Sequence, residues 1–224
     1  MKKYRSVGKF IRHILYNEDG FIFIFALLIM FPIFIFSMSN IVNYTNMVTF
    51  SDEDTSEGLA LACKDAAMQV DSKALANGLV RVKSDLALQR FQKTLAANLG
   101  YDETSFNPKP GSAYVSKPKY WVLVYNGYND YQSNGSYPAR LYYFDGNSLT
   151  ISDVSFGGFP YTFTVSNTGI TVGSGGTRRV TLTTPGVIAV IQHEGTRVTG
   201  DKQLNIVRWA AARVVCKDGT CKVI

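Results

Sequence analysis

The pattern of apolar and polar residues begins with one long apolar block. No charged residue occurs in Gly20–Ser51, and Phe21–Phe36 is apolar throughout, with Pro32 as a break in helical hydrogen bonding. Continued to Val42, this segment would form a helix about 33 Å long, enough to cross a bilayer core of about 30 Å. The pattern therefore predicts a transmembrane or assembly helix over residues 21–50.

Helical spacing continues beyond this block. The polar stretch Ser51–Gly58 ("SDEDTSEG") predicts a kink or a new helix start, since Ser and Asp cap helices and acidic residues suit the first turn. A further helix is expected from a cap at Ser84 or Asp85 to a stop at Gly100. Residues 51–106 are therefore predicted to be a helical region. Two apolar stripes recur at helical spacing: Leu59, Ala62, Cys63, Ala66, Ala67 and Val70, then Leu88, Phe91, Leu95 and Leu99.

The remainder of the chain is rich in strand-forming residues. A proline-containing connector, Asn107–Tyr120, leads into it, and Asp145–Gly146 and Asn167–Gly169 are hairpin turns by composition, with a flexible loop at Gly173–Gly176. The element order predicts an α+β fold, in which a long N-terminal helix and a second helix pack on an antiparallel sheet formed by residues 107–224. The expected strands are Tyr120–Tyr125, Arg140–Phe144, Leu149–Val154, Tyr161–Val165, Gly169–Val172, Arg179–Thr183, Val187–Gln192, Asn205–Cys216 and Cys221–Ile224.

Charge gives the apolar block a direction. The chain has a net charge of +6, and without residues 1–20 it would carry about +3, so the basic balance does not predict a specific nucleic-acid partner. The positive-inside rule places residues 1–20 in the cytoplasm as a basic leader and the bulk of the chain outside a cell membrane, crossed once. The leader bases are Lys2, Lys3, Arg5, Lys9 and Arg12, and the acidic residues after the block are Asp52, Glu53, Asp54 and Glu57.

Three interpretations of the apolar block are open. It could be a secretory signal cleaved after Ser37–Ser39, although both the apolar core and the polar leader are long for such a signal. It could be an uncleaved anchor for an extracytoplasmic binding or sensory domain. The third interpretation uses the order of features: a basic leader, Gly20, the aromatic residue Phe21, and an apolar helix that continues outward.

That order resembles the class III signal of type IV pilins and their relatives. The resemblance implies that a prepilin peptidase cuts between Gly20 and Phe21, and that the apolar helix stays on the mature protein and enters the filament core. Phe25, Pro32 and Phe36 would then belong to the assembly helix. Most such pilins carry glutamate at the fifth mature position, where this chain has Phe25, which favours a minor or specialised subunit.

Two further stretches, Asp85–Asp102 and Thr184–Val215, are similar to segments of TadE-like pilin proteins of tight-adherence systems. The resemblance implies a structural subunit of a type IV or tight-adherence pilus, with other pilin subunits, the pilus assembly machinery and the membrane as partners. Its destination would be the cell surface.

The three cysteines suggest one disulfide. Asp218–Gly219 is a type I′ hairpin turn by composition, which would place Cys216 opposite Cys221, close enough for a cross-strand disulfide. Such a bond fits an extracytoplasmic location. The sequence lacks nearby thiols and histidines for zinc, and Cys63 is expected to be a small buried residue.

No motif predicts catalysis, a metal site or a cofactor, and we expect a protein that is not an enzyme. His193 could be assigned to a catalytic triad, but a strand-end role is the simpler expectation. Two groups leave binding open. The aromatic residues of 120–143 could contact a polymer or a neighbouring subunit, or simply pair across strands. The arginines that could bind polyanions are Arg178, Arg179, Arg197, Arg208 and Arg213.

Overall fold

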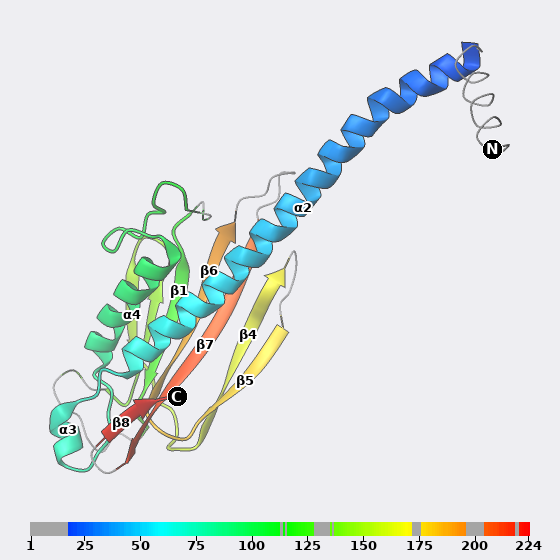
Figure 1. Cartoon of the computed structure of the whole chain (residues 1–224). Helices are drawn as coiled ribbons and strands as arrows, with labels where there is room; N and C mark the ends of the chain where they lie inside the picture. Colours follow the sequence, from blue (N-terminus) through cyan, green and yellow to red (C-terminus); the bar gives the residue numbers. More distant parts are fainter. Residues whose placement is uncertain are drawn as a thin grey trace. The chain divides into compact units, whose positions relative to one another are not determined.

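The computed structural model of the chain describes residues 18–224 except 113, 115, 128–134, 136, 172–175, 196–203 and 218–219, with side chains left undescribed at 18–24, 43–51, 167–171, 195, 204–205 and 217. The chain divides into two compact units, Met1–Met47 and Val48–Ile224. Figure 1 shows the elements in sequence order. The predicted leader residues 1–17 lie outside the described part, while its last three residues already belong to the first described helix.

Helix α2 runs without interruption from Glu18 to Ala67, a span of 50 residues. The predicted new helix start at Ser51–Gly58 is therefore wrong. The polar residues suggested a cap, but Thr55 and Gly58 are buried within unit Val48–Ile224, so tertiary packing keeps this stretch helical.

Two shorter helices follow. Helix α3 (Ser72–Ala76) was not predicted, and it begins where the Asp71 carboxylate accepts hydrogen bonds from the amides of Lys73 and Ala74. Helix α4 (Ser84–Leu99) ends as expected at Gly100, which adopts the left-handed conformation with φ of 67° and donates its amide to the Ala96 carbonyl.

The start of α4 differs from the expectation. Lys83, not Ser84 or Asp85, is the N-cap, and no side chain caps the first turn. Ser84 is the first helical residue and is buried. Asp85 instead accepts hydrogen bonds from Arg140 and Tyr142 of the sheet, at 3.1 Å and 2.8 Å, so long-range contacts replace a local cap.

The described residues form eight strands, antiparallel throughout, in the order β3-β2-β1-β6-β7-β4-β5, with β8 paired to β7. The chain is therefore α+β. One prediction is wrong: Asn167–Gly169 is not a hairpin turn but part of β4, whose register shifts between Val165 and Thr168 as its partner changes from β5 to β7. The strands are β1 (Lys119–Tyr125), β2 (Ala139–Phe144), β3 (Leu149–Asp153), β4 (Tyr161–Thr171), β5 (Gly176–Leu182), β6 (Gly186–Gly195), β7 (Leu204–Lys217) and β8 (Thr220–Val223).

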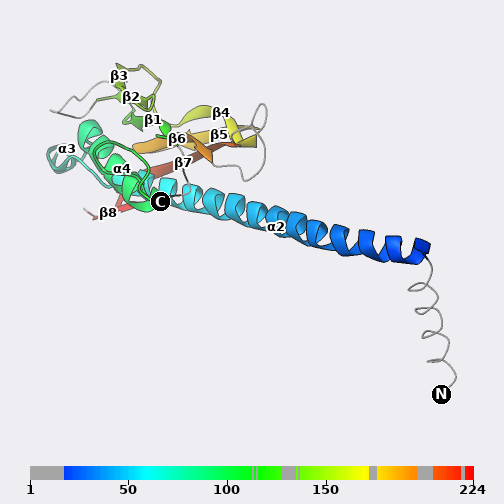
Figure 2. The same ribbon diagram turned by 90° about the horizontal axis from the view of Figure 1, so that it is seen from above.

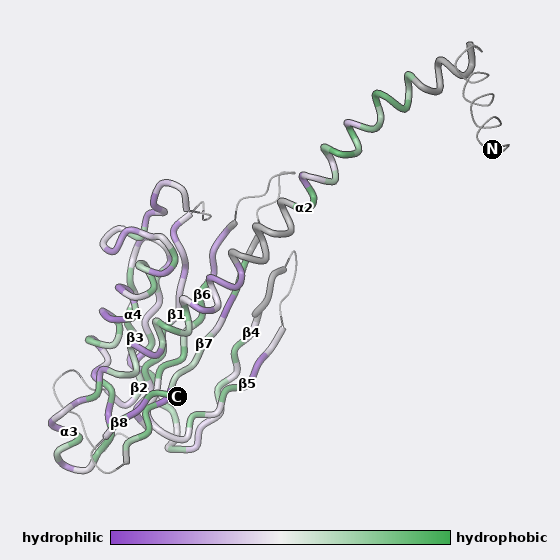
Figure 3. Tube along the Cα trace, viewed as in Figure 1, coloured by the Kyte–Doolittle hydropathy of each residue, from purple (hydrophilic) through white to green (hydrophobic). Residues whose placement is uncertain are grey.

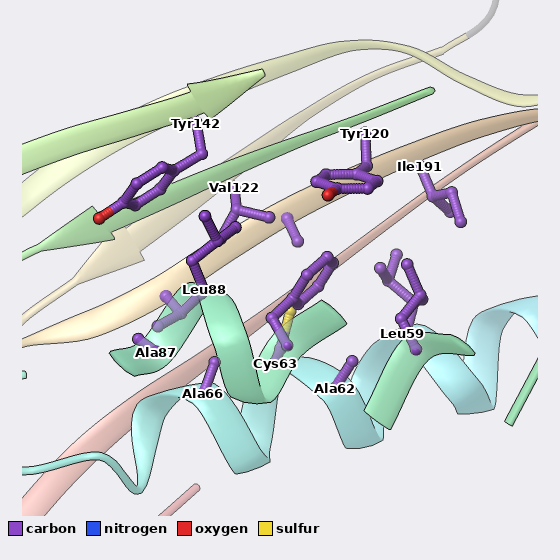
Figure 4. Close-up of a cluster of buried hydrophobic side chains, with 14 of the residues drawn as sticks. Leu59, Ala62, Cys63, Ala66, Ala87, Leu88, Tyr120, Val122, Tyr142 and Ile191 are labelled. Carbon is purple, nitrogen blue, oxygen red and sulfur yellow. The ribbon is translucent and has the colours of Figure 1, made fainter. Parts of the chain in front are cut away.

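One face of the sheet is covered by α4 and the C-terminal part of α2, which lie together on the same side in both ribbon views (Figures 1 and 2). Both predicted helical stripes point into this layer, apart from Val70, which is only partly buried against it. Figure 4 shows the interleaved side chains from both helices and the sheet. The labelled residues are Leu59, Ala62, Cys63 and Ala66 of α2, Ala87 and Leu88 of α4, and Tyr120, Val122, Tyr142 and Ile191 of the sheet.

The opposite face carries a second buried cluster. Tyr125 of β1 lies 5.1 Å from Phe163 of β4, measured between ring centroids, although β6 and β7 separate the two strands in the sheet order. The sheet is therefore strongly curved, which brings the β4–β5 pair over this face. The cluster contains Tyr125, Ala139, Phe163, Val165, Val180, Leu182 and Ile188.

Candidate functional site

The first candidate site is the stretch Phe25–Val42 of α2, called the apolar segment below. It is long and apolar enough to cross a membrane, and no part of it is buried in the structure. Figure 3 shows its predominantly hydrophobic colouring. A helix that is apolar on all sides needs an apolar environment on all sides, such as lipid or other helices.

The predicted cleavage junction lies at the start of α2. Gly20 and Phe21 fall within the first turn of this helix, which begins at Glu18. The side chain of Phe21 is outside the described residues.

The predicted assembly residues are displayed on the helix surface. Phe25 is 57% exposed and Phe36 is 70% exposed. Pro32 stands inside the helix without ending it, and with Leu27, Leu28 and Phe31 it lines a shallow apolar hollow. Because proline lacks an N–H group, one helical hydrogen bond is missing at this point.

The second half of α2 has a different surface. Apart from Leu59, its buried stripe consists of small residues that let the helix lie close to its neighbours. Gly58 illustrates this: a Cβ atom added there would lie 2.8 Å from Cδ2 of Leu99 on α4. Nearby, Cys63 is fully buried and its thiol lies 3.6 Å from the carbonyl oxygen of Ala210 on β7.

A group of polar side chains joins α2 to the sheet within this apolar layer, and we call it the polar clamp. It consists of Asp52 and Thr55 of α2, Tyr114, His193 of β6 and Arg208 of β7. Asp52 and Arg208 form an ion pair. The Thr55 hydroxyl lies 2.9 Å from the Tyr114 hydroxyl and 3.2 Å from Nε2 of His193.

His193 is the most constrained member of the clamp. It is 1% exposed, and its Nδ1 atom has no hydrogen-bond partner among the described residues. Burial, together with the charge of Arg208, lowers the pKa of its imidazole to about 3. His193 is therefore a buried neutral residue near the end of β6, in keeping with the simpler expectation.

The surroundings of His193 can be compared with those that a catalytic triad would need. The hydroxyl nearest to His193 belongs to Thr55, which is fully buried, so neither group reaches solvent in this conformation. Sequence reasoning missed the clamp because Thr55 and His193 are 138 positions apart. A pairing of that kind leaves no periodic signal in the sequence, and Asp52 was interpreted as part of a helix start.

The aromatic residues are mostly core rather than surface. Tyr120, Tyr125 and Tyr142 are fully buried. Trp121 and Tyr143 are partly buried and stack directly across β1 and β2, with ring centroids 4.9 Å apart. Cross-strand pairing thus accounts for them. Tyr128 and Tyr131 lie outside the described residues.

The arginines do not form one surface. Arg178 and Arg179 are exposed on β5, whereas Arg208 is engaged by Asp52 and Arg213 donates to the Thr183 hydroxyl at 2.6 Å. Arg197 lies outside the described residues. The four described arginines therefore do not form one polyanion-binding group.

The cysteines occupy the expected places. Cys216 and Cys221 lie opposite each other on β7 and β8 and form a disulfide, while the intervening turn Asp218–Gly219 is outside the described residues. Cys63 is a free buried thiol, and burial raises its pKa to about 12.

In the part of the chain that the structure describes, no group of three or more His, Cys, Asp or Glu side chains is arranged to hold a metal ion. Comparison with models of protein families, with curated proteins and with solved structures gave no match.

Proposed function

We propose that this protein is a pilin-like structural subunit, a minor component of a bacterial type IV or tight-adherence pilus. The observation that carries the proposal is the exposed apolar segment. It follows the Gly20–Phe21 junction directly and belongs to the same continuous helix whose second half is part of a folded α+β unit. This arrangement suits a helix that serves first as a membrane span and then as a filament element.

The working mechanism would be physical rather than chemical. Cleavage after Gly20 frees a new terminus at Phe21, and the apolar segment then exchanges lipid for the equivalent helices of other subunits. Both surroundings are apolar, so the exchange requires little change in solvation, and side-chain packing selects the assembled state. Pro32 adds local adaptability to the helix.

Phe25 argues for a specialised subunit. It is an apolar, exposed side chain at the fifth position after the proposed cleavage site. A carboxylate there would need a buried partner in the filament, and phenylalanine needs none. The subunit would therefore enter the assembly by packing alone, without an ion pair to fix its depth.

The orientation follows from charge and redox chemistry. The basic leader favours the cytoplasmic side, and the acidic start of the second half of α2 favours the opposite side. The Cys216–Cys221 disulfide is compatible with an oxidising compartment outside the cytoplasm.

The test is N-terminal sequencing of the mature protein after co-expression with a prepilin peptidase. The proposal expects Phe21 at the terminus. A Gly20→Leu variant should stay uncut, whereas Gly8→Leu, a matched change elsewhere in the leader, should be processed normally. Met1 at the terminus in the presence of active peptidase, or Asn40 produced by a signal peptidase, would refute the proposal.

A second candidate is a single-pass anchor for an extracytoplasmic binding or sensory domain, with the helix left uncleaved. The uniformly apolar surface of the segment favours it, since lipid alone satisfies every side chain from Phe25 to Val42 except a few hydroxyl and amide groups. In that case Met1 persists and the protein never appears in sheared surface filaments.

A further inference from the structure

The polar clamp lies where the second half of α2 meets β6 and β7, inside an otherwise apolar layer. Three of the five polar side chains, those of Thr55, Tyr114 and His193, are buried, and burying a polar side chain costs free energy unless it keeps a hydrogen-bond partner. We propose that the clamp is a protonation-sensitive latch: it holds the Asp52–Leu59 stretch of α2 on the sheet at neutral pH and releases it when His193 gains a proton.

The geometry leaves no room for a protonated His193. An imidazolium ion donates from both ring nitrogens. Thr55 Oγ1 lies 3.2 Å from Nε2 and can accept one of these hydrogen bonds, but Nδ1 faces no acceptor among the described residues. The Tyr114 ring covers His193 at 4.4 Å between centroids, so water does not reach the ring from that side.

The surrounding charges also oppose protonation. Arg208 of the neighbouring strand presents a guanidinium on the same face as His193, and the carboxylate of Asp52 on α2 is already paired with this guanidinium. Two phenols lie on the Tyr114 side of the ring: that of Tyr114, which packs against His193, and that of Tyr101, which stacks on Tyr114 at 5.2 Å. Burial raises the pKa of the Tyr101 phenol, so it stays neutral. Among the described residues, the recorded contacts of His193 are with Thr55 and Tyr114, and neither carries a negative charge that would compensate a second positive charge.

The sign of the pH dependence follows. In the closed latch the pKa of His193 lies near 3, and in an open, hydrated state it returns to 6.5. The open state therefore binds a proton more readily at every pH below 6.5, and the closed state loses stability as pH falls through this range. For these two values, the opening equilibrium should rise about 25-fold between pH 7 and pH 5.

The experiment is hydrogen exchange on the full chain in detergent micelles, with opening constants for the amides of residues 52–59 corrected for intrinsic exchange. The chain has two histidines, so a His13→Gln background leaves His193 as the histidine that titrates between pH 5 and pH 7. The amides of α4, residues 84–99, serve as an internal reference. The proposal expects the 25-fold rise at 52–59 and little change in α4. An equal rise in α4 would indicate global unfolding and overturn the local latch.

Two variants complete the test. His193→Gln cannot take up the proton, so its opening constants at 52–59 should change less than about threefold over the same range. Thr55→Val keeps His193 but removes a contact, so the latch should be more open at pH 7 and retain its pH dependence. A pH slope that survives in His193→Gln would refute the proposal.

If His193→Gln does not fold, the histidine signal is followed by NMR in the unmodified domain of the full chain. A ring that titrates near pH 6.5 while residues 52–59 stay protected would refute the proposal equally. A ring that stays neutral to pH 5 in the protected state supports it.

Discussion

The two halves of α2 belong to one continuous helix but differ in burial and in the distribution of apolar residues. In the apolar segment every side of the helix is hydrophobic and none of it is buried, so the environment must supply the packing. In the second half, one stripe of mainly small residues is buried against α4 and the sheet, and the remaining surface is exposed or partly exposed and carries polar residues together with Leu61. The first half therefore requires an apolar environment, whereas the second half requires specific packing partners within the folded unit.

This difference separates two kinds of mutational sensitivity. A helix surrounded by lipid tolerates changes of shape but not of charge, because any apolar side chain is solvated equally well. A helix seated in a folded core tolerates neither a lost methyl group nor an added one on its buried stripe, yet accepts charge on its exposed sides. The following changes test this contrast, from the largest expected effect to the smallest.

Leu59→Ala should lower the free energy of unfolding of the Val48–Ile224 unit by about 2–5 kcal/mol, since it opens a cavity at a fully buried position. Leu28→Ala makes the same chemical change in the apolar segment, at a residue 67% exposed, and should leave this value unchanged. Urea unfolding followed by the fluorescence of Trp121 and Trp209 measures both. Equal losses in the two variants would erase the distinction between the halves.

Ile33→Arg should raise the free energy of membrane insertion by about 2.5–3.5 kcal/mol, because it places a charge near the centre of the apolar segment. Ile33→Leu, which keeps the apolar character, is the matched control. Alkaline extraction of membranes measures the integrated fraction. Unchanged integration of the arginine variant would mean that the segment does not reside in a hydrocarbon environment.

Ala66→Leu should destabilise the same folded unit by about 1–3 kcal/mol, since the added atoms have no space between α2 and its neighbours. Ala60→Leu, one turn and a half earlier and only partly buried, is the comparison. Thermal unfolding by circular dichroism distinguishes them. A neutral Ala66→Leu would indicate that the helix is loosely seated.

Leu61→Lys should change the stability of the unit by less than about 0.5 kcal/mol, because this side chain is 41% exposed on the outer side of α2. The same unfolding measurement applies. A loss above 2 kcal/mol would show that the side chain of Leu61 contributes to the packed core of the unit.

Local patterns in the sequence were sufficient for much of the fold. The stripes of α2 and α4 and the stop at Gly100 follow from spacing and from glycine chemistry, and the observed strands lie close to the expected ones. Errors arose where a distant contact overrode a local preference. Ser51–Gly58 resembles a helix start, but its burial against the rest of the unit keeps it helical.

The candidate sites divide in the same way. The apolar segment was evident because its signal is local composition. The polar clamp was not evident from the sequence, because its members come from α2, the Tyr114 connector and two strands. None of them belongs to a local motif. Strand β4 was also mispredicted because of a distant contact. The turn-forming residues Asn167–Gly169 predicted a hairpin, but they lie where the partner of β4 changes from β5 to β7.

The alkylation rate of Cys63 is a probe of local opening of α2. Its thiol is sealed beneath α2, and at pH 8 a pKa of about 12 leaves roughly one thiolate in ten thousand. The other two cysteines are consumed by their disulfide, so an alkylating reagent finds no other thiol in the oxidised chain. The rate at which Cys63 is labelled therefore measures how often the second half of α2 separates from the sheet, in a micelle or a membrane alike.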